Sequence, residues 1–528
     1  MALDATQAMP RLKLPWETDF VTLLYWTSPA ATLSDPGRAA AAQQRGTGMV
    51  NKGEQALWRR EHASRFSVIV DADRYFEVAR VALLQARSRI MLVGWDFDAR
   101  IVLNRKEREP GEPAAIGDFL YWLVDRTPGL ELYLLRWDVG AIKSLFRGTT
   151  LITMLHWMRH PRIHTKLDTH HPTGSSHHQK IVAIDDCFAF CGGIDMTGER
   201  WDTRHHRDGE PGRRTPAGRP YKPWHDATTA VAGPAALALG ELCRDRWHRA
   251  TGTKLAPTSP RDACWPDNLP TNIEDAQIGI ARTIPVMDDQ QPVDEIEKLF
   301  LSQIARARRH VYIESQYFAS RRIAEAIGRR LQEPHGPEFV IINPLTAEGW
   351  LQPIAMDSAR ARLMKALRAL DTHGRLRMYH PYTEGGEPIY VHAKIMVVDD
   401  RTVRIGSANI NNRSMKLDTE CDVILDASDN DAAKVAELAL RLRDDLLAEH
   451  LGCELEDVRA AVEQSGSLIA AIETLRKPGK TLREYELPEL GPTFTWLADN
   501  ELLDPEGPDE MFEPLAERGL FRGRLRRR

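Results

Sequence analysis

Two short stretches of this sequence repeat the same chemical groups in the same order. Residues 177–185 read HHQKIVAID and residues 391–399 read VHAKIMVVD. Each stretch has a histidine, a lysine two positions later, and an aspartate after four apolar residues. The groups in them that could act on a substrate are His178, Lys180, His392 and Lys394.

The residue types in the two motifs indicate phosphate chemistry. Residues i and i+2 of an extended strand face the same side, so each histidine and its lysine can project from one surface. A lysine ammonium beside an imidazole suits phosphate oxygens and does not suit a metal ion. Fourteen residues after each histidine comes a small-residue turn, GGID at 192–195 and GSAN at 406–409, where backbone and short polar groups can approach the same oxygens.

Cleavage of a phosphodiester through a covalent intermediate requires two groups on opposite sides of phosphorus. One is the nucleophile, and the other is an acid that protonates the leaving oxygen. A single motif supplies one imidazole. The repetition therefore predicts that two halves of the chain converge about a pseudo-twofold axis to form one active site.

The composition is that of an ordinary globular protein of two large lobes. The chain has 528 residues, of which 42% are hydrophobic and 27% charged, and its formal net charge is −5, so nucleic acid is not the expected partner. Its six cysteines form no CxxC pair and are expected to be buried thiols in a reducing compartment. No ordinary signal peptide and no apolar stretch of about 20 residues is apparent, so membrane contact is expected to be peripheral.

Alternating strand and helix patterns occur in both halves of the chain. We expect strand, helix and strand over 67–97, helix and strand over 116–138, and the same alternation over 295–345. Aligning IMLVGWDF with VYIESQYF gives an offset of 221 residues, and the two motifs give 214. The pattern predicts an α/β fold of two similar α/β/α sandwich lobes related by a pseudo-twofold axis, each with a mixed sheet flanked by helices. The expected divisions are an N-terminal extension (1–62), a first lobe (63–270), a second lobe (271–450) and a helical C-terminal extension with a basic tail (451–528).

These motifs together resemble the phospholipase D superfamily, specifically its two-motif members that cleave phospholipids and its eukaryotic-type catalytic core. Besides the two repeated stretches, the resemblance rests on GGIDMTGERWD, PWHD, VYIESQYF and IGSANINNRSMKLDTE, and it covers about residues 63–450. It implies hydrolysis of phosphatidylcholine-like lipids to phosphatidic acid and free alcohol through a phosphohistidine, with no metal or cofactor. It also implies transfer of the phosphatidyl group to another alcohol. The rival readings are a cardiolipin synthase-like phosphatidyltransferase, a nuclease, and a lipid-binding protein without catalysis.

The resemblance also implies residue roles. His178 is expected as the nucleophile and His392 as the general acid, although the near symmetry of the halves leaves the reverse open. The phosphate would be held by Lys180, Lys394, Asn409, Ser407 and Gly193. The carboxylate that orients His392 would be Glu420, and that of His178 would be Asp202, with Asp195 as the alternative. Asp185 and Asp399 are expected to support the structure.

The remaining polar and aromatic features have less specific readings. His170, His171, His177, His205 and His206 match no standard zinc spacing, so we expect solvated or rim histidines and no metal site. Trp224 and His225 are expected to pack behind the first motif rather than to line the pocket. The loop at Trp350 is either an interfacial loop that enters lipid headgroups or a buried loop, and the arginine-rich tail either attracts anionic lipid or is solvated. A monomer acting on phospholipid at a membrane surface is expected, either cytoplasmic or peripheral, or exported without a signal peptide.

Overall fold

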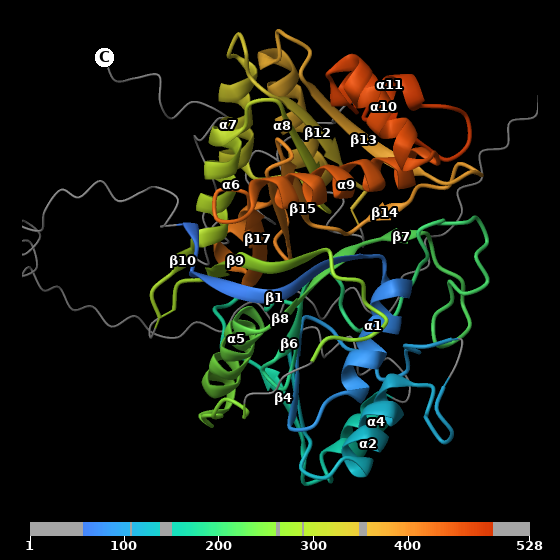
Figure 1. The fold of residues 1–528 in the computed structure, drawn as a ribbon, viewed down its shortest axis with the longest axis vertical. Coiled ribbons are helices and arrows are strands. Elements are labelled where there is room, and N and C mark those ends of the chain that lie inside the picture. The colour runs from blue at the N-terminus through green and yellow to red at the C-terminus, as the bar shows by residue number, and fades with distance from the viewer. Residues whose placement is uncertain are drawn as a thin grey trace, which may run out of the picture. The chain divides into compact units, whose positions relative to one another are not determined.

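The computed structural model describes residues 56–105, 108–137, 150–259, 264–287, 290–347 and 356–488. Within these residues the protein is a mixed α/β structure in which a 16-stranded sheet is flanked by helices (Figure 1). The first half of the chain, blue to green, and the second half, yellow to red, form two lobes. We call residues 56–270 lobe 1 and residues 271–488 lobe 2.

Lobe 1 contributes seven of the strands and four helices to the described structure. Its strands are β1 (Arg59–Val70), β2 (Arg89–Gly94), β3 (Glu131–Trp137), β4 (Ile163–Asp168), β5 (Ile181–Ile184), β6 (Phe188–Gly192) and β8 (Ala227–Ala232). Its helices are α1 (Ala72–Leu84), α2 (Ile116–Arg126), α4 (Thr150–Trp157) and α5 (Pro234–Thr251). Helix α2 shows why such segments pack on the sheet, since its buried residues recur every three or four positions.

Lobe 2 repeats this order and adds elements at its end. Its strands are β9 (Ile273–Ile284), β10 (Val293–Asp294), β11 (His310–Glu314), β12 (Glu338–Ile342), β13 (Leu376–Tyr382), β15 (Ile395–Val398), β16 (Thr402–Gly406), β17 (Glu420–Asp426) and β18 (Thr481–Glu484). Its helices are α6 (Glu295–Arg306), α7 (Arg321–Leu331), α8 (Ser358–Leu370), α9 (Ala432–Leu451), α10 (Leu455–Ser465) and α11 (Leu468–Leu475). A short separate pair, β7 (Trp224–His225) and β14 (Tyr390–Val391), joins the two lobes.

The strand order shows the pseudo-twofold relation directly. From the middle outward, lobe 1 runs β1-β8-β6-β5-β2-β3-β4 and lobe 2 runs β9-β17-β16-β15-β11-β12-β13. The two long strands β1 and β9 pair antiparallel from Arg59 opposite Ile280 to Phe66 opposite Ile273, so the lobes share one continuous sheet. Figure 1 shows these two strands side by side between the lobes.

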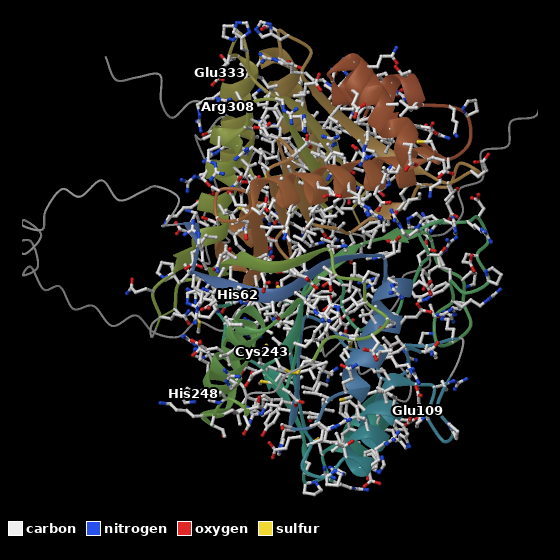
Figure 2. The ribbon with its side chains drawn as sticks, in the orientation of Figure 1. His62, Glu109, Cys243, His248, Arg308 and Glu333 are labelled. Atoms are coloured by element: carbon white, nitrogen blue, oxygen red, sulfur yellow. A yellow bond between two sulfur atoms is a disulfide. The ribbon has the colours of Figure 1, made fainter. Side chains whose placement is uncertain are left out.

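The core lies between the sheet and the helices on its two faces, where the side chains of Figure 2 are densely packed. The strands within the two motifs, β5 (IVAI) and β15 (IMVV), are buried at every residue, as expected of central strands covered on both faces. The histidine and lysine of each motif lie just before its strand, and the aspartate follows it.

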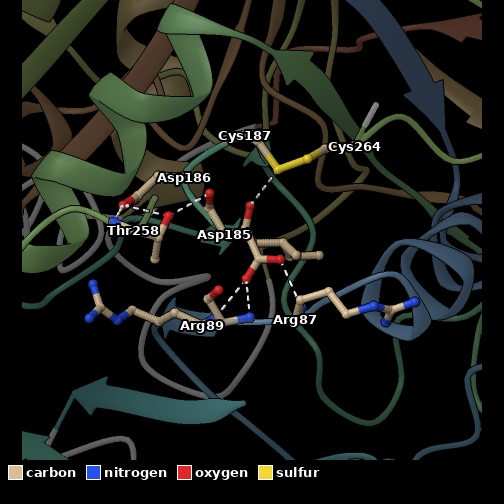
Figure 3. Close-up of a disulfide and its surroundings, with 9 residues drawn as sticks. Arg87, Arg89, Asp185, Asp186, Cys187, Thr258 and Cys264 are labelled. Carbon is tan, nitrogen blue, oxygen red and sulfur yellow. Dashed lines mark hydrogen bonds between the residues drawn. A yellow bond between two sulfur atoms is a disulfide. The ribbon is translucent and has the colours of Figure 1, made fainter. Parts of the chain in front are cut away.

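The motif aspartates fasten the strands rather than face a substrate. The carboxylate of Asp185 accepts hydrogen bonds from the backbone N–H of Arg87, Ser88 and Arg89 (Figure 3), and that of Asp399 accepts them from residues 308–310. Both aspartates have positive φ, 49° and 52°. Each thus ties the turn after its motif strand to the start of the neighbouring antiparallel strand, β2 for Asp185 and β11 for Asp399.

The structure corrects the expectation that all six cysteines are thiols. Cys187 and Cys264 form a disulfide within lobe 1 (Figure 3), whereas Cys191, Cys243, Cys421 and Cys453 are free. The sequence signal was absent because the two partners are 77 residues apart and follow no recognised spacing.

The ends of the chain differ from the expected divisions. Strand β1 begins at Arg59, so the last residues assigned to an N-terminal extension belong to the central sheet. Strand β18 pairs with β13, so the segment after α9 is part of lobe 2. Of the described helices, none combines the length and apolarity required to cross a bilayer. Trp350 and the arginine-rich tail lie outside the described residues.

Candidate active site

Each motif histidine is attached through its backbone to the opposite lobe. The N–H of His178 donates to the carbonyl of Thr419 at 3.0 Å, and the N–H of His392 donates to the carbonyl of His225 at 2.8 Å. The second contact continues the pairing of β14 with β7. The histidines therefore lie in extended segments leading into β5 and β15, where the two lobes meet.

The carboxylate partners of the two histidines are also exchanged between lobes. Nδ1 of His178 in lobe 1 lies 3.0 Å from both carboxylate oxygens of Glu420 in lobe 2. Nδ1 of His392 in lobe 2 lies 2.6 Å from Oδ2 of Asp226 in lobe 1. A carboxylate on Nδ1 fixes the ring and leaves Nε2 for the substrate.

The predicted carboxylate partners are therefore wrong in two respects. Glu420 was expected on His392 and lies on His178 instead. Asp202 was expected on His178, but its carboxylate hydrogen-bonds to His206 and Arg213. Both errors have one cause, since partners were sought within the same repeat while the fold exchanges them.

Asp226 was missed by the analysis of the sequence, although a signal was present. It is the last residue of the PWHD stretch and immediately precedes β8, while Glu420 begins β17. In the sheet Gly192 lies opposite Thr228 and Gly406 lies opposite Asp422, so Asp226 and Glu420 occupy equivalent positions two residues earlier. Aligning the last core strand of each half would have paired these acids.

In the turns after β6 and β16, Gly193 and Ser407 serve the carboxylates and do not line the cavity. Ser407 Oγ donates to Glu420 Oε2 at 2.5 Å, and Ser414 Oγ donates to Oε1 at 2.7 Å. Gly193, in the position equivalent to Ser407, has its N–H bonded to the carbonyl of Ala227, and a Cβ there would overlap Oδ1 of Asp226. The expectation that Ser407 and Gly193 bind phosphate is thus replaced by a role in placing the two acids.

The lysines stand beside the histidines in unequal surroundings. Lys180 Nζ lies 3.2 Å from the Asp195 carboxylate, so Asp195 pairs with a lysine and not with a histidine. Lys394 Nζ lies 3.4 Å from Oε1 of Gln316, which also accepts a hydrogen bond from Asn409 Nδ2 at 3.2 Å. Oδ1 of Asn409 is buried and makes no hydrogen bond within the described structure. The lobe 2 side therefore carries neutral amides where lobe 1 carries a carboxylate.

Both histidines open into one cavity of about 310 Å³. His178 is the more accessible, with 15% of its side chain exposed against 6% for His392. Beside His178, the rings of Trp95 and Trp137 stack with their centroids 6.0 Å apart. The cavity is also lined by Ser176, Arg200, Gln316, Tyr317, Met356, Asn409, Asn411, Arg413, Ser414 and Asp418.

Trp224 and His225 do not line this cavity. The Trp224 ring stacks on Tyr390 at 4.6 Å and lies 5.1 Å from the His392 ring. Both residues are buried, so they pack as expected, but behind the second motif instead of the first.

The environment holds both histidines neutral before a substrate binds. Burial, reinforced by the positive charges of Lys180 and Lys394, lowers the pKa of His178 and of His392 well below the ordinary value. Burial also raises the pKa of Glu420 to about 8 and lowers that of Lys394 to about 7. When Glu420 is ionised, the neutral His178 imidazole donates its Nδ1–H to the carboxylate and presents a lone pair at Nε2, which is the form a nucleophile requires.

The arrangement can bind an anionic diester and attack it. Two imidazoles and the Asn409 amide line one cavity, and each lysine lies beside its histidine, with Nζ donating to that histidine's carbonyl. These cationic and hydrogen-bonding groups suit a phosphate. The phosphate's negative charge would favour the protonated form of one imidazole, which then supplies the proton for the leaving oxygen.

Two family models match overlapping parts of the chain. Residues 82–324 match the model described as phospholipase D, and residues 300–442 match the model described as cardiolipin synthase, PLD-like domain. The two matches overlap and together run through both motifs and both lobes.

Several curated proteins are similar to this chain at low identity. Phospholipase D A of Dictyostelium discoideum is 25% identical over 481 residues, covering 75% of this chain and 36% of that protein. Phospholipase D alpha 1 of Vigna unguiculata is also 25% identical, and the alignment covers 65% of this chain and 59% of that protein. The chain therefore matches less than two thirds of the length of these relatives.

A solved structure shares the fold. The phosphatidylserine synthase of Haemophilus influenzae Rd KW20 superposes with a TM-score of 0.50 at 14% identity, covering 74% of this chain and 91% of that one. This likeness supports the two-lobed α/β architecture described above.

Proposed function

Because this chain belongs to the phospholipase D superfamily of phosphodiesterases and phosphatidyltransferases, we propose that it cleaves phosphatidylcholine-like glycerophospholipids to phosphatidic acid and free alcohol. The observation that carries the proposal is the crossed pair of imidazole–carboxylate couples, His178 with Glu420 and His392 with Asp226. Each lobe alone holds one histidine and the other histidine's acid, so only the joined lobes make a complete site.

The reaction we propose proceeds in two displacements. Nε2 of His178 attacks phosphorus, the bond to the leaving alcohol breaks, and the protonated His392 gives its proton to that oxygen. The phosphatidyl group is then held on His178 by a phosphorus–nitrogen bond. Water, deprotonated by His392, attacks this phosphohistidine and releases phosphatidic acid. Lys180, Lys394 and Asn409 would stabilise the charge on the non-bridging oxygens.

The cavity wall supports a lipid as the substrate. The phosphatidyl group retained after the first step would be bonded to His178, and Trp95 and Trp137 line the cavity beside this histidine. Their stacked rings offer an apolar wall for the glycerol and the first acyl carbons. A nucleic acid would instead favour an extended basic surface, and the chain's net charge of −5 does not favour one.

A second candidate is transfer of the same phosphatidyl group to another alcohol in place of water. The match of residues 300–442 to the cardiolipin synthase, PLD-like domain favours it. Both reactions share the phosphohistidine and differ only in the acceptor.

We propose a monomer acting peripherally at a lipid surface, with no nucleic acid partner. The Cys187–Cys264 disulfide favours an oxidising compartment, and therefore the exported alternative over the cytoplasmic one.

The proposed reaction is tested on vesicles of phosphatidylcholine, phosphatidylethanolamine or phosphatidylglycerol, with released headgroup and lipid products measured. We expect headgroup release and phosphatidic acid, with His178→Ala inactive although it unfolds at the normal temperature. His373→Ala, which alters an exposed histidine, should retain activity. Cardiolipin formed from phosphatidylglycerol without hydrolysis would identify the transferase. Cleavage of plasmid alone, or lipid binding without turnover, would refute both.

A further inference from the structure

A second cluster of ionisable side chains lies behind His392 and is not used in the reaction. It comprises Asp71 between β1 and α1, His206 in the loop before β7, His225 in β7, and Glu449 near the end of α9. Their side chains are between 0% and 2% exposed. One donor atom from each lies within 4.8 Å of the others.

The spacing of these donor atoms suits a small tetrahedral ion. His225 Nδ1 is 2.8 Å from Glu449 Oε1 and 3.3 Å from Asp71 Oδ1. His206 Nε2 is 3.0 Å from Glu449 Oε1 and 3.6 Å from Asp71 Oδ2. Zinc bonds to nitrogen and oxygen of about 2.0–2.1 Å in a tetrahedron place neighbouring ligand atoms about 3.3 Å apart. The observed separations lie on both sides of that value.

Two of the donor atoms lack the hydrogen bonds that a purely protein network would provide. Nδ1 of His225 and Oδ2 of Asp71 are buried and make no hydrogen bond with any described residue. Each has an oppositely charged atom within ion-pair distance, with Glu449 Oε1 2.8 Å from Nδ1 of His225 and His206 Nε2 3.6 Å from Oδ2 of Asp71. Leaving such groups unsatisfied in a buried site is costly, which points to a missing ligand at the centre of the cluster.

In both histidines, the ring nitrogen that is not a candidate metal ligand lies beside a carboxylate. His206 Nδ1 lies 3.0 Å from Asp202 Oδ2, and His225 Nε2 lies 2.8 Å from Glu314 Oε2. This is the arrangement of metal-bound histidines, whose other ring N–H donates to a carboxylate. Asp202 is balanced in turn by Arg213, and Glu314 is bonded to His450. Without an ion, each imidazole would lie between acids on both of its nitrogens.

We propose that Asp71, His206, His225 and Glu449 bind one divalent transition-metal ion of the zinc type. Two carboxylates neutralise its charge, and imidazole with carboxylate is a ligand set that zinc accepts. Four protein ligands fill a tetrahedron and leave no open position, so the ion is structural. The ligands come from four separate segments, which is why no zinc spacing appears in the sequence.

The ion would join the two lobes next to the residues that hold His392. Glu449 is in lobe 2, and the other three ligands are in lobe 1. The carbonyl of His225 accepts the N–H of His392, and the next residue, Asp226, holds Nδ1 of the same histidine. Fixing His225 therefore positions His392 and its acid. The binding proposal itself does not depend on the proposed reaction.

The test uses the full chain, expressed without a metal-affinity tag in zinc-supplemented medium and dialysed before its metal content is measured by mass spectrometry. We expect about one zinc ion per chain. His206→Ala and Glu449→Ala should each lose it. His310→Ala is the matched control, because His310 is also buried and lies 3.1 Å from the carboxylate of Asp400. It should retain the ion.

A second measurement applies if the variants do not fold. A strong chelator should lower the unfolding temperature of the unmodified protein, and added Zn²⁺ should restore it. Co²⁺ in place of zinc should give the intense visible absorption of tetrahedral coordination. The proposal is overturned if the unmodified protein carries no transition metal and neither chelator nor Zn²⁺ changes its unfolding temperature. It is equally overturned if the folded variants retain the ion.

Discussion

Nδ1 of His178 lies 3.0 Å from the carboxylate of Glu420, a residue of the opposite lobe. The carboxylate is buried, accepts hydrogen bonds from two serine hydroxyls, and sits where it can stabilise the positive charge that develops on the ring during attack. The proposed catalysis therefore requires both lobes, which also share one sheet.

Glu420→Gln should lower turnover by about 100-fold or more, because an amide keeps the shape but cannot ionise to stabilise the imidazolium that forms during attack. Turnover and KM on phospholipid vesicles would be measured separately, with the decrease expected in turnover. Glu297→Gln, which changes another buried carboxylate bonded to Arg322, is the control and should remain active. Unchanged turnover in Glu420→Gln would show that the pairing has no catalytic role.

Gly193→Ala should impair the other histidine indirectly. The added methyl group would overlap Oδ1 of Asp226 and displace that carboxylate from Nδ1 of His392. We expect at least about a tenfold decrease in turnover with the fold retained. The control is Gly198→Ala in the same loop, where the nearest atom to a new Cβ is 3.5 Å away. Equal activity of the two variants would contradict the packing argument.

Trp137→Ala should lower activity on lipid substrates more than activity on small soluble ones. Removing one of the stacked rings takes away apolar contact with the glycerol and acyl carbons, so kcat/KM on vesicles should fall by about tenfold. Hydrolysis of a small soluble aryl phosphodiester should change little. Trp122→Ala, at a partly buried tryptophan on α2, serves as the control. A parallel loss on both substrates would mean that Trp137 supports the fold instead.

Lobe 2 should lose stability in mild acid through His380. Its Nδ1–H donates to the carbonyl of Asn343 at 2.9 Å, and burial lowers its pKa to about 4. Since the folded pKa is below the unfolded value of about 6.5, the unfolded chain binds more protons between pH 6.5 and 4. The free energy of unfolding should therefore fall with decreasing pH in this window, by at most about 1.4 kcal/mol per pH unit from this group.

The check is denaturant unfolding at several pH values. His380→Gln should reduce the slope, and His373→Gln, at an exposed histidine, should leave it unchanged. If both variants keep the full slope of the unmodified protein, His380 does not titrate as inferred.

Much of the fold follows from local patterns that the sequence displays. The apolar runs of β5 and β15, the helical periodicity of α2 and the repeated motifs predict two α/β halves with a histidine before each central strand. The pairing of β1 with β9 was not predictable in this way, because register between distant strands is set by tertiary packing.

The site was harder to predict than the fold because its contacts cross between lobes. Spacing along the chain indicated the motif histidines and lysines, but the family resemblance assigned Glu420 to the wrong ring, and Asp226 was overlooked. His206 was predicted to be a solvated or rim histidine, because its spacing fits no zinc motif. Its ring is instead completely buried among carboxylates from both lobes. Long-range ionic contacts leave no periodic signal, so only the folded arrangement shows them.

The central claim is tested most directly by trapping the covalent intermediate. The protein would be mixed with phospholipid labelled at phosphorus, quenched within a turnover in alkali, which preserves phosphorus–nitrogen bonds, and digested for mass spectrometry. We expect label on His178, more of it in His392→Asn if that residue activates water, and none in His178→Asn. Active protein that yields no labelled histidine, or carries the label on a residue outside the two motifs, would contradict the central claim.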